Sequence, residues 1–253
     1  MREEWITSRK NPLLVQIRRL ASSRGARRSA GMFLGDGVKL LEEALKWGAP
    51  LETVVYSEGL DGPELPPEVR TVRVPEDVMA SISPMESPQG ALFLCRMWDT
   101  APPPRLEGGR YLVLDGLQDP GNVGTIWRTA DALEADGLLL VHGCADPFGP
   151  KVVRATMGAC FRLPVWETGP ERLAGLLERS GLALYATALR EDTEDIKTAD
   201  LSRSAVVIGS EGRGVSPELL AMSQRALKIP MRERCESLNA AAAAAVVLWA
   251  MGR

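Results

Sequence analysis

The chain has 253 residues, of which 45% are hydrophobic and 25% are charged, and this composition excludes a mostly disordered or fibrous protein. Because this length exceeds that of the commonest single domain, we expect two domains of medium size. The net charge is −3, yet the first thirty residues hold eight Lys or Arg against two Glu, a local charge of +6 that leaves −9 for the rest. This asymmetry predicts a cationic surface that binds phosphate, although a solvated helix face has the same composition.

The N-terminal segment is basic and has a helical pattern. Apolar residues recur at helical spacing from Asn11 to about Leu20, with Arg18 and Arg19 beside them, which predicts a basic amphipathic helix. The start, MREEWITSRKNP, lacks the apolar core of a signal peptide. The candidate phosphate-binding residues are Arg9, Lys10, Arg18, Arg19, Arg24, Arg27 and Arg28.

Short strands and helices alternate in the rest of the first hundred residues. Strands are predicted at 31–35, 53–57, 71–74 and 90–97, and helices at 38–48 and 75–83. This alternation is typical of a small α/β domain, which we assign to residues 1–98. Prolines at 102–104 stiffen the chain and glycines at 108 and 109 release it, so residues 99–109 are predicted to be a linker.

Residues 110–253 are predicted to form the second domain. Its runs RYLVLDG, GLLLVHG, RLPVWE, GLALYATA and SAVVIGS alternate with helical stretches, which predicts a mostly parallel sheet covered by helices on both faces. The apolar segment Ala240–Met251 is shorter than the roughly 20 residues of a membrane span, so we expect a buried helix there.

The four cysteines, Cys95, Cys144, Cys160 and Cys235, have no paired spacing, and the single histidine, His142, cannot complete a zinc set with them. We therefore expect no metal site. Their scatter through apolar segments is typical of reduced, partly buried thiols in a cytoplasmic protein.

The first of three turns that follow predicted strands is DGLQDPGNVGTIWRTADAL. Pro120 and Gly121 bend the chain, and Asn122 is predicted to cap the helix that begins there. Gly124 leaves room for close approach, and Arg128 lies one helical turn beyond it, so that its guanidinium could face the turn. The alternative is an ordinary arginine on the surface of a capped helix.

The second turn is GSEGRG, whose glycines at 209, 212 and 214 permit unusual backbone conformations and leave N–H groups pointing outward. Ser216 and Pro217 then begin a helix. Glu211 could bind a hydroxyl or a guanidinium, or be only a turn residue. The spacing matches neither G-x-G-x-x-G nor G-x-x-x-x-G-K-[ST], which argues against hydride transfer and phosphoryl transfer.

The third turn is IPMRERCESLNA, in which Ile229–Pro230 end a strand and an exposed charged loop follows at 231–235. Ser237 and Asn239 then lie where a helix of alanines begins, and they could do no more than cap it. Ligands bind where the strands of open α/β sheets end. Three such turns in one domain therefore predict a binding site made largely of backbone groups.

In this order, the three turns closely resemble the motifs of the SpoU/TrmH branch of the SPOUT RNA methyltransferases. That family has an Asn-x-Gly-x-x-x-Arg turn and helix, a Gly-x-Glu-x-x-Gly turn, and an Ile-Pro-Met segment leading to Ser-Leu-Asn. Here these motifs are Asn122, Gly124 and Arg128; Gly209, Glu211 and Gly214; and Ile229, Pro230, Met231, Ser237, Leu238 and Asn239. The segments ITSRKNPLLVQIRRL and GMFLGDGVKLLEEAL look like the L30e-like substrate-binding domain often attached to the family.

The resemblance implies an α/β protein whose C-terminal SPOUT domain is trefoil-knotted. Its activity would be methylation of a ribose 2′-hydroxyl in structured RNA by S-adenosyl-L-methionine. Ribosomal RNA is the expected substrate, because the front domain is similar to a ribosomal RNA binder, and transfer RNA is the alternative. The basic N-terminal residues would bind this RNA. The cofactor-binding residues would be Gly209, Glu211, Gly214, Ile229, Met231, Leu238 and Asn239.

The catalytic residues that the resemblance implies are Arg128, Asn122, Glu211, Ser237 and Asn239. Because an arginine side chain keeps its proton in proteins, Arg128 is expected to stabilise negative charge on the reacting oxygen and a nearby phosphate, not to remove the proton. Asn122 and Ser237 would orient the nucleotide, and Glu211 would organise its turn and hold Arg128. Relatives form homodimers that build each RNA site from two chains, which makes Ala240–Met251 the expected interface.

The sequence departs from the family pattern in two segments. Ala241 stands where many relatives carry serine, so a hydrogen bond from that hydroxyl is absent. Gly35, Asp36 and Gly37 stand where Val-Glu-Gly is usual, which leaves the RNA contacts of the front domain open.

Two other functions compete with this interpretation. A non-catalytic RNA-binding or assembly factor of the same fold would bind RNA through the basic segment, but it would not need Asn122, Arg128, Glu211 and Asn239 together. A nucleotide-dependent dehydrogenase would carry an acidic residue about 20 positions after a glycine fingerprint, and the sequence has no such pair.

Overall fold

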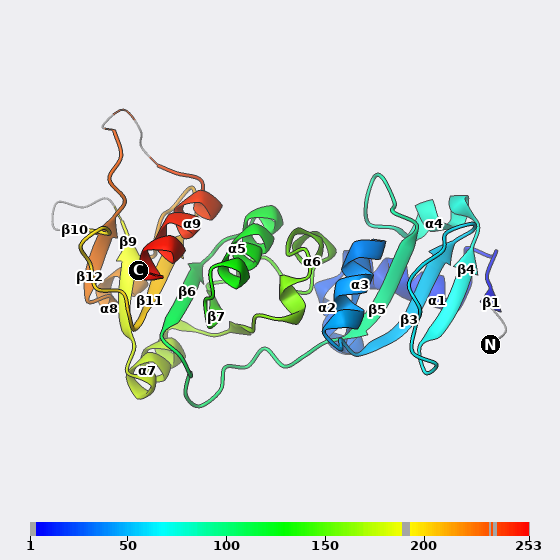
Figure 1. The fold of residues 1–253 in the computed structure, drawn as a ribbon, viewed down its shortest axis with the longest axis horizontal. Helices are drawn as coiled ribbons and strands as arrows, with labels where there is room; N and C mark the ends of the chain where they lie inside the picture. Colours follow the sequence, from blue (N-terminus) through cyan, green and yellow to red (C-terminus); the bar gives the residue numbers. More distant parts are fainter. Residues whose placement is uncertain (1–3, 189–192, 233, 235–236, 253) are drawn as a thin grey trace. The chain divides into compact units, whose positions relative to one another are not determined.

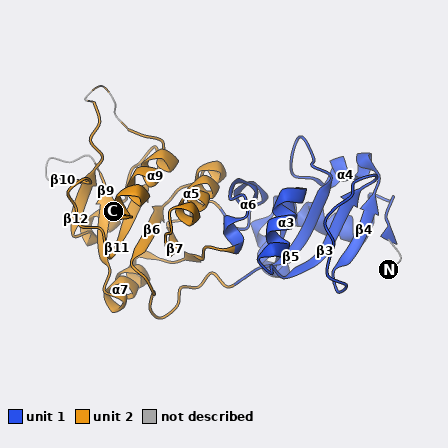
Figure 2. Cartoon of the chain, viewed as in Figure 1, with its two compact units in different colours: residues 1–98, 146–161 blue, residues 99–145, 162–253 orange. Residues whose placement is uncertain are grey.

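The computed structural model describes residues 4–188, 193–232, 234 and 237–252. The chain divides into two compact units, residues 1–98 with 146–161 and residues 99–145 with 162–253 (Figure 2). Each unit has its own sheet and its own hydrophobic core (Figure 1). No helix among the described residues is long and apolar enough to cross a membrane.

The first unit contains a five-stranded mixed sheet of strand order β1-β4-β3-β5-β2, in which β5 runs antiparallel to both neighbours. The strands are β1 (Glu4–Trp5), β2 (Met32–Asp36), β3 (Leu51–Ser57), β4 (Arg70–Val74) and β5 (Ala91–Arg96). The helices are α1 (Pro12–Ser22), α2 (Arg24–Ala30), α3 (Val38–Lys46) and α4 (Glu76–Ile82). These elements agree with the predicted small α/β domain, to which they add the edge strand β1 and helix α2.

Helix α1 forms where the amphipathic pattern predicts it. The Asn11 side chain accepts a hydrogen bond from the Leu13 N–H at 2.9 Å, and Pro12 lies in the first turn, where a helix needs no N–H donor. The apolar stripe is buried in the core of the first unit and consists of Leu13, Leu14, Ile17 and Leu20. The basic residues of the helix are left on its other faces.

The segment 146–161 lies in the first unit, although it follows a strand of the second unit in the sequence. It contains α6 (Pro150–Ala155) and the 3-10 turn η1 (Ala159–Phe161). Phe148 packs against Phe33 of β2 and against Trp98, with ring centroids 5.3 and 4.7 Å apart. The predicted limits 1–98 and 110–253 differ from the two units at this segment, because no local pattern reports contacts made so far along the chain.

The second unit contains a seven-stranded sheet of order β10-β12-β9-β11-β6-β7-β8, and all of its strand pairs are parallel. The strands are β6 (Arg110–Asp115), β7 (Gly137–Val141), β8 (Val165–Glu167), β9 (Ala183–Thr187), β10 (Glu194–Asp195), β11 (Ser204–Gly209) and β12 (Arg225–Lys228). The helices are α5 (Pro120–Ala132), α7 (Pro170–Ser180), α8 (Pro217–Met222) and α9 (Ala240–Met251). The predicted parallel sheet is confirmed.

The helices that pack on this sheet form two groups, α7 with α8 and α5 with α9. Leu173 of α7 and Leu219 of α8 share a core with Tyr111 and Val113 of β6. Helices α5 and α9 pack against each other and against β7 and β11, and Figure 1 shows them in front of the sheet. Strand β7 is buried along its whole length. Because alternate residues of a strand face opposite sides of the sheet, this burial means that both faces of β7 are covered.

Residues 99–109 are part of the second unit and not a free linker. Leu106 is buried in that unit's core, and its N–H donates to Ser180 Oγ at 2.9 Å. The Pro104 carbonyl accepts a hydrogen bond from Arg179 Nε at 2.9 Å. The proline-rich stretch is therefore held along α7 by the side chains at the end of that helix.

The three turns follow β6, β11 and β12. Since these strands are parallel, all three turns leave the sheet at the same edge. Strands β6 and β11 are in direct register, with Gly209 paired to Asp115 at their carboxyl ends. The first and second turns therefore begin side by side.

Candidate active site

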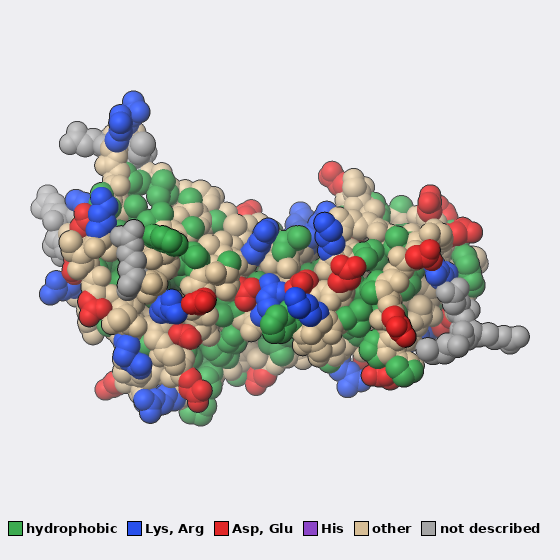
Figure 3. Space-filling view, in the orientation of Figure 1, with side chains coloured by type: hydrophobic (Ala, Val, Ile, Leu, Met, Phe, Trp, Pro, Cys, Tyr) green, Lys and Arg blue, Asp and Glu red, His purple; other side chains and the backbone are tan. Residues whose placement is uncertain are grey.

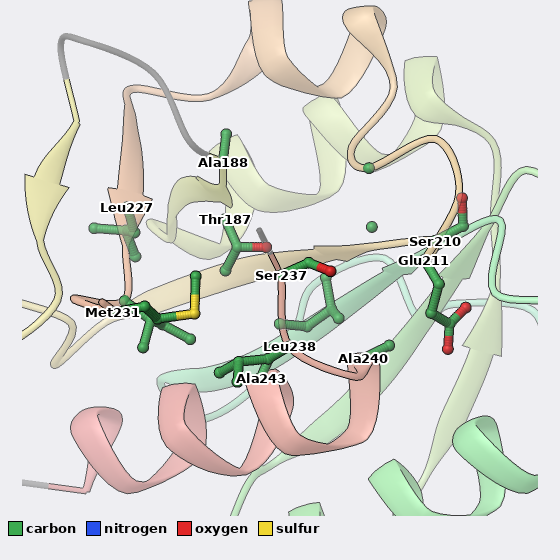
Figure 4. A pocket seen from close by; sticks show the side chains of 14 residues that line it. Thr187, Ala188, Ser210, Glu211, Leu227, Met231, Ser237, Leu238, Ala240 and Ala243 are labelled. Atoms are coloured by element: carbon green, nitrogen blue, oxygen red, sulfur yellow. The ribbon is translucent and has the colours of Figure 1, made fainter. Parts of the chain in front are cut away.

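A cavity of about 260 Å³ lies at the carboxyl edge of the parallel sheet. Figure 4 shows Leu227 and Met231 at one end and Ser210 and Glu211 at the other. Six predicted cofactor-binding residues line it: Gly209, Glu211, Gly214, Ile229, Met231 and Leu238. Ser237 also lines the cavity, whereas Asn239 lies at its rim.

The second turn needs glycine for a specific packing reason. A Cβ at Gly209 would lie 2.2 Å from the carbonyl carbon of Gly214 and 2.3 Å from the Val215 nitrogen. Gly214 has a φ of +66°, and its N–H donates to the Ser210 carbonyl at 2.8 Å. The turn thus folds back on itself over the end of β11, which leaves peptide groups at the cavity wall.

The third turn ends in a well-formed helix cap. Asn239 Oδ1 accepts hydrogen bonds from the N–H groups of Ala241 and Ala242 at 2.9 and 3.3 Å. Asn239 is therefore the cap of α9, and Ser237 is not, so the hydroxyl of Ser237 is left at the cavity. In the loop before this cap, the structure does not describe residues 233, 235 and 236. The prediction of a reduced thiol at Cys235 therefore lies outside the described part of the chain.

Asn122, Glu211 and Asn239, one from each turn, form a continuous hydrogen-bonded chain. Asn239 Nδ2 donates to Asn122 Oδ1 at 3.1 Å, and Asn122 Nδ2 donates to Glu211 Oε1. The helix cap uses Asn239 Oδ1, so the Asn239 amide has its Nδ2 directed at Asn122. Asn122 Oδ1 accepts this hydrogen bond, so Asn122 Nδ2 is directed at Glu211, and both amide orientations are fixed. We name these three residues the rim cluster.

Asp119, and not Asn122, caps α5, so the prediction that Asn122 begins this helix is wrong. Asp119 Oδ1 accepts a hydrogen bond from the Asn122 N–H at 2.7 Å, and Pro120 is the first helical residue. An aspartate cap followed directly by proline is a stronger signal for the start of a helix than an asparagine two positions after that proline. The Asn122 side chain is consequently available for the rim cluster.

Arg128 is exposed on α5 and does not line the cavity. It lies six positions after Asn122, which places the two side chains about 120° apart around the helix axis. Its guanidinium forms no hydrogen bond or ion pair with any residue that the structure describes. The expected contact with Glu211 is not formed within the chain, because Glu211 binds Asn122 instead.

Sequence reasoning missed part of the cavity wall. Thr187 ends β9 and Ala188 follows it, Ser210 follows β11, and Leu227 belongs to β12. Thr187 Oγ1 donates to the Val207 carbonyl at 2.8 Å, which fixes it at the strand end. The one available signal was positional, since the carboxyl ends of parallel strands lie at the same edge of a sheet.

The basic residues of the N-terminal segment differ in their surroundings. Arg27 is buried, and its Nε and Nη2 donate to Asp146 Oδ2 at 2.9 and 2.6 Å. Arg27 is therefore not available for RNA contact, and the prediction for this residue is wrong; its side chain forms a buried structural ion pair.

The other basic residues of the segment are more exposed. Arg9 pairs with Asp77 at 2.6 Å, but both side chains are exposed. On the face drawn in Figure 3, basic and acidic side chains are interspersed. The exposed candidates are Arg9, Lys10, Arg19, Arg24 and Arg28.

The described cysteines, Cys95, Cys144 and Cys160, are free thiols and buried. Burial raises the pKa of Cys95 to about 12 and also raises the pKa of Cys144. The thiols of Cys95 and Cys144 are therefore kept in their neutral form and behave as small apolar side chains of the two cores.

Both parts of the chain match known families. Residues 109–249 match the family described as SpoU rRNA Methylase, and this match covers more than half of the chain. The chain belongs to the SpoU rRNA methylase family. Residues 11–92 of this methyltransferase match the MRM3-like substrate binding domain, so the front part has a family of its own.

Three relatives match the methyltransferase over nearly its full length. An uncharacterized tRNA/rRNA methyltransferase of Synechocystis sp. is 36% identical over 96% of this chain and 92% of its own. The 23S rRNA (guanosine(2553)-2′-O)-methyltransferase RlmP of Bacillus subtilis is 32% identical over 96% and 97%. The AdoMet-bound rRNA methyltransferase from Sinorhizobium meliloti has a TM-score of 0.85 at 30% identity, over 98% and 97% of the two chains. The protein is an S-adenosylmethionine-dependent RNA 2′-O-methyltransferase.

The cavity of the methyltransferase fits this cofactor. Its wall is mostly apolar, with Leu227, Met231 and Leu238, while the glycines of the second turn expose peptide groups. The described lining contains a single ionisable side chain, Glu211. An apolar slot with a few backbone partners suits a nucleoside ring, and the absence of a Cβ at Gly209 lets the ligand approach the main chain.

Proposed function

We propose that this methyltransferase acts on ribosomal RNA and that the rim cluster positions the ribose whose 2′-hydroxyl is methylated. The observation that carries this proposal is the hydrogen-bonded chain through Glu211, Asn122 and Asn239 at the edge of the cofactor cavity. A protein that only binds RNA has no need of such an arrangement. The similarity to the Bacillus subtilis enzyme, which acts on 23S rRNA, supports ribosomal RNA as the substrate.

The chemistry divides between the cofactor and the chain. S-adenosylmethionine supplies an electrophilic methyl group on a sulfonium sulfur. The chain must hold the 2′-oxygen in line with that methyl group and stabilise negative charge as the hydroxyl loses its proton. Asn122 suits the first task because its amide already has one orientation. Arg128 suits the second, since its planar fork binds an oxygen and a phosphate at once.

We propose further that the protein is a homodimer formed through α9. Ala242, Val246 and Trp249 form an exposed apolar stripe at helical spacing, and the Trp249 side chain is 60% exposed. A notch of about 210 Å³ beside it is lined by Leu133, Leu248 and Trp249, among others. Because Arg128 lies away from the rim cluster of its own chain, a partner's Arg128 could complete the site.

We also propose that the chain forms a trefoil knot within the second unit. After β11 the chain passes to β12 on the far side of β9 and then returns to α9, which packs on β11. The turns after β11 and β12 therefore both border the cavity. If the chain is knotted, stretching single molecules by their ends will leave a contour shorter than 253 extended residues.

The experiment that tests the function is a map of 2′-O-methylation in total RNA from cells with and without this protein. We expect the loss of methylation at one or a few ribosomal RNA nucleotides, restored by the wild-type gene. Loss from transfer RNA instead would make transfer RNA the substrate. An unchanged map, together with no binding of S-adenosylmethionine at millimolar concentration, would favour the RNA-binding or assembly factor.

A further inference from the structure

Asp115 is a buried carboxylate that the proposed mechanism does not use. It ends β6, its side chain is 2% exposed, and both of its oxygens are engaged. Oδ1 binds His142 Nδ1 at 2.6 Å, and Oδ2 accepts a hydrogen bond from the Ser216 N–H at 2.6 Å. Neither Asp115 nor His142 lines the cofactor cavity. A buried carboxylate with these two partners has a role other than direct contact with the ligand.

Asp115 lies at both ends of the second turn, at one end through its backbone and at the other through its carboxylate. Gly209, where the turn begins, is the register partner of Asp115 across β11 and β6. Ser216, where the turn ends, donates its N–H to Asp115 and also caps α8 by accepting the Leu219 N–H. Glu211, which lies between these two ends, binds Asn122 of the rim cluster. One residue thus fixes the base of the loop that forms the cavity wall, by strand pairing at Gly209 and by its carboxylate at Ser216.

His142 extends this connection to helix α8. It follows β7 directly and has a φ of +53°, an uncommon backbone conformation for a residue with a side chain. Nε2 lies 3.3 Å from Glu218 Oε2, so the ring stands between one carboxylate of β6 and one of α8. The neighbouring Cys144 thiol donates to the Leu114 carbonyl and not to the ring. A protonated imidazole can donate to both carboxylates, whereas a neutral one can donate to only one.

We infer that Asp115 and His142 are positioning residues that hold the second turn in the conformation that binds S-adenosylmethionine. Asp115 closes the turn at Ser216, and His142 in its protonated form ties Asp115 to Glu218. This inference rests on the cavity being the cofactor site. It assigns a function to the single histidine of the chain, which the three motifs leave unexplained.

Because this bridge needs a protonated His142, the inference predicts that cofactor affinity depends on pH. The hydrogen bond to Asp115 raises the pKa of His142, burial opposes this, and Glu218 adds a smaller increase. The bridge between the two carboxylates is therefore complete below pH about 6.5, the ordinary value for histidine, and is lost as the pH rises through the higher pKa of the folded protein. Affinity for the cofactor should fall over the same range.

The first test is calorimetric titration of the full-length protein with S-adenosylmethionine across pH 6 to pH 9. For Asp115→Asn we expect a loss of affinity of about ten- to a hundredfold, since the amide cannot accept from both neighbours. For His142→Gln we expect weaker binding at low pH and wild-type binding at high pH. Because the cofactor's own ionisation is common to all proteins, the ratio of variant to wild-type affinity isolates His142.

Asp131→Asn is the matched control, because Asp131 pairs with Arg162 at 2.7 Å in the same unit but away from the cavity. It should lower thermal stability and leave cofactor affinity unchanged. If Asp115→Asn also lowers only the stability, Asp115 is merely structural and the inference is overturned. The same follows if the affinities of His142→Gln and the wild type have a constant ratio at every pH.

The second test follows the imidazole by proton NMR in untagged protein, where a single histidine gives one assignable titration. We expect a midpoint above 6.5 that falls in Asp115→Asn and in Glu218→Gln. Cofactor should raise the wild-type midpoint, because linkage is reciprocal. A midpoint that does not respond to bound cofactor would contradict the inference. Failure of the wild type to bind S-adenosylmethionine at all would instead contradict the function proposed for the cavity.

Discussion

At the scale of single residues, the cavity wall depends on the missing side chain of Gly209. Gly209→Ala would place a Cβ 2.2 Å from the Gly214 backbone, so the second turn must move away from β11. We expect S-adenosylmethionine to bind at least about ten times more weakly, measured by calorimetry. Gly212→Ala is the matched control, because its Cβ would meet nothing within 4 Å. Equal losses in both variants would show that the packing at Gly209 is not the cause.

Arg128 should affect chemistry and not cofactor binding. Arg128→Lys retains the charge but loses the planar fork, and the residue does not line the cavity. We expect the methylation rate at saturating cofactor to fall about 10²- to 10³-fold, with an unchanged dissociation constant for S-adenosylmethionine. Arg225→Lys, at an exposed arginine paired with Glu194, serves as the control. A wild-type rate in Arg128→Lys would remove Arg128 from the reaction.

The sequence predicted residues and their partners unequally. Glycines at 209 and 214 could be recognised because backbone conformation is a local property of the chain. The bond from Asn122 to Glu211 spans 89 residues and could not be recognised. Arg27 looked like its neighbours in the sequence, yet a carboxylate 119 residues away buries it. Local patterns give the type of a residue, whereas its partner depends on which strands become neighbours.

At the scale of elements, the segment 146–161 is held in the first unit by a buried ion pair. Arg27 and Asp146 are 2.6 Å apart, and their side chains are 7% and 10% exposed. Asp146→Asn leaves a buried guanidinium without its charge partner, so we expect a loss of about 3–5 kcal/mol in the free energy of unfolding. The measurement is urea unfolding followed by tryptophan fluorescence, since Trp98 packs against Phe148 beside this pair.

The exposed pair Arg9–Asp77 provides the control for that measurement. Its distance is the same, 2.6 Å, but the side chains are 58% and 67% exposed. Asp77→Asn should change the free energy of unfolding by about 1 kcal/mol or less, because water solvates both partners. If the two variants lose equal stability, burial is not what makes the Arg27–Asp146 pair important.

At the scale of the whole molecule, assembly should control activity. Trp249→Arg places a charge in the exposed stripe of α9, where we expect a dimer, and should weaken association by at least about thirtyfold. Light scattering at micromolar concentration should then give the mass of one chain, and methylation should fall with it. Trp47→Arg changes an equally prominent tryptophan, 50% exposed, in the first unit and should leave the mass unchanged. A monomeric wild type would rule out the proposed interface.

The sequence by itself determined the fold class, the parallel sheet and the residues that make the turns, because strand periodicity, helix caps and glycine turns act over a few neighbouring positions. Only the tertiary structure decided that one residue from each turn meets in the rim cluster, that Asp115 and His142 stand behind the second turn, and that 146–161 joins the first unit. The contacts of the second unit depend on strand order, which places β11 between β9 and β6. No pattern within a short stretch of sequence carries that order.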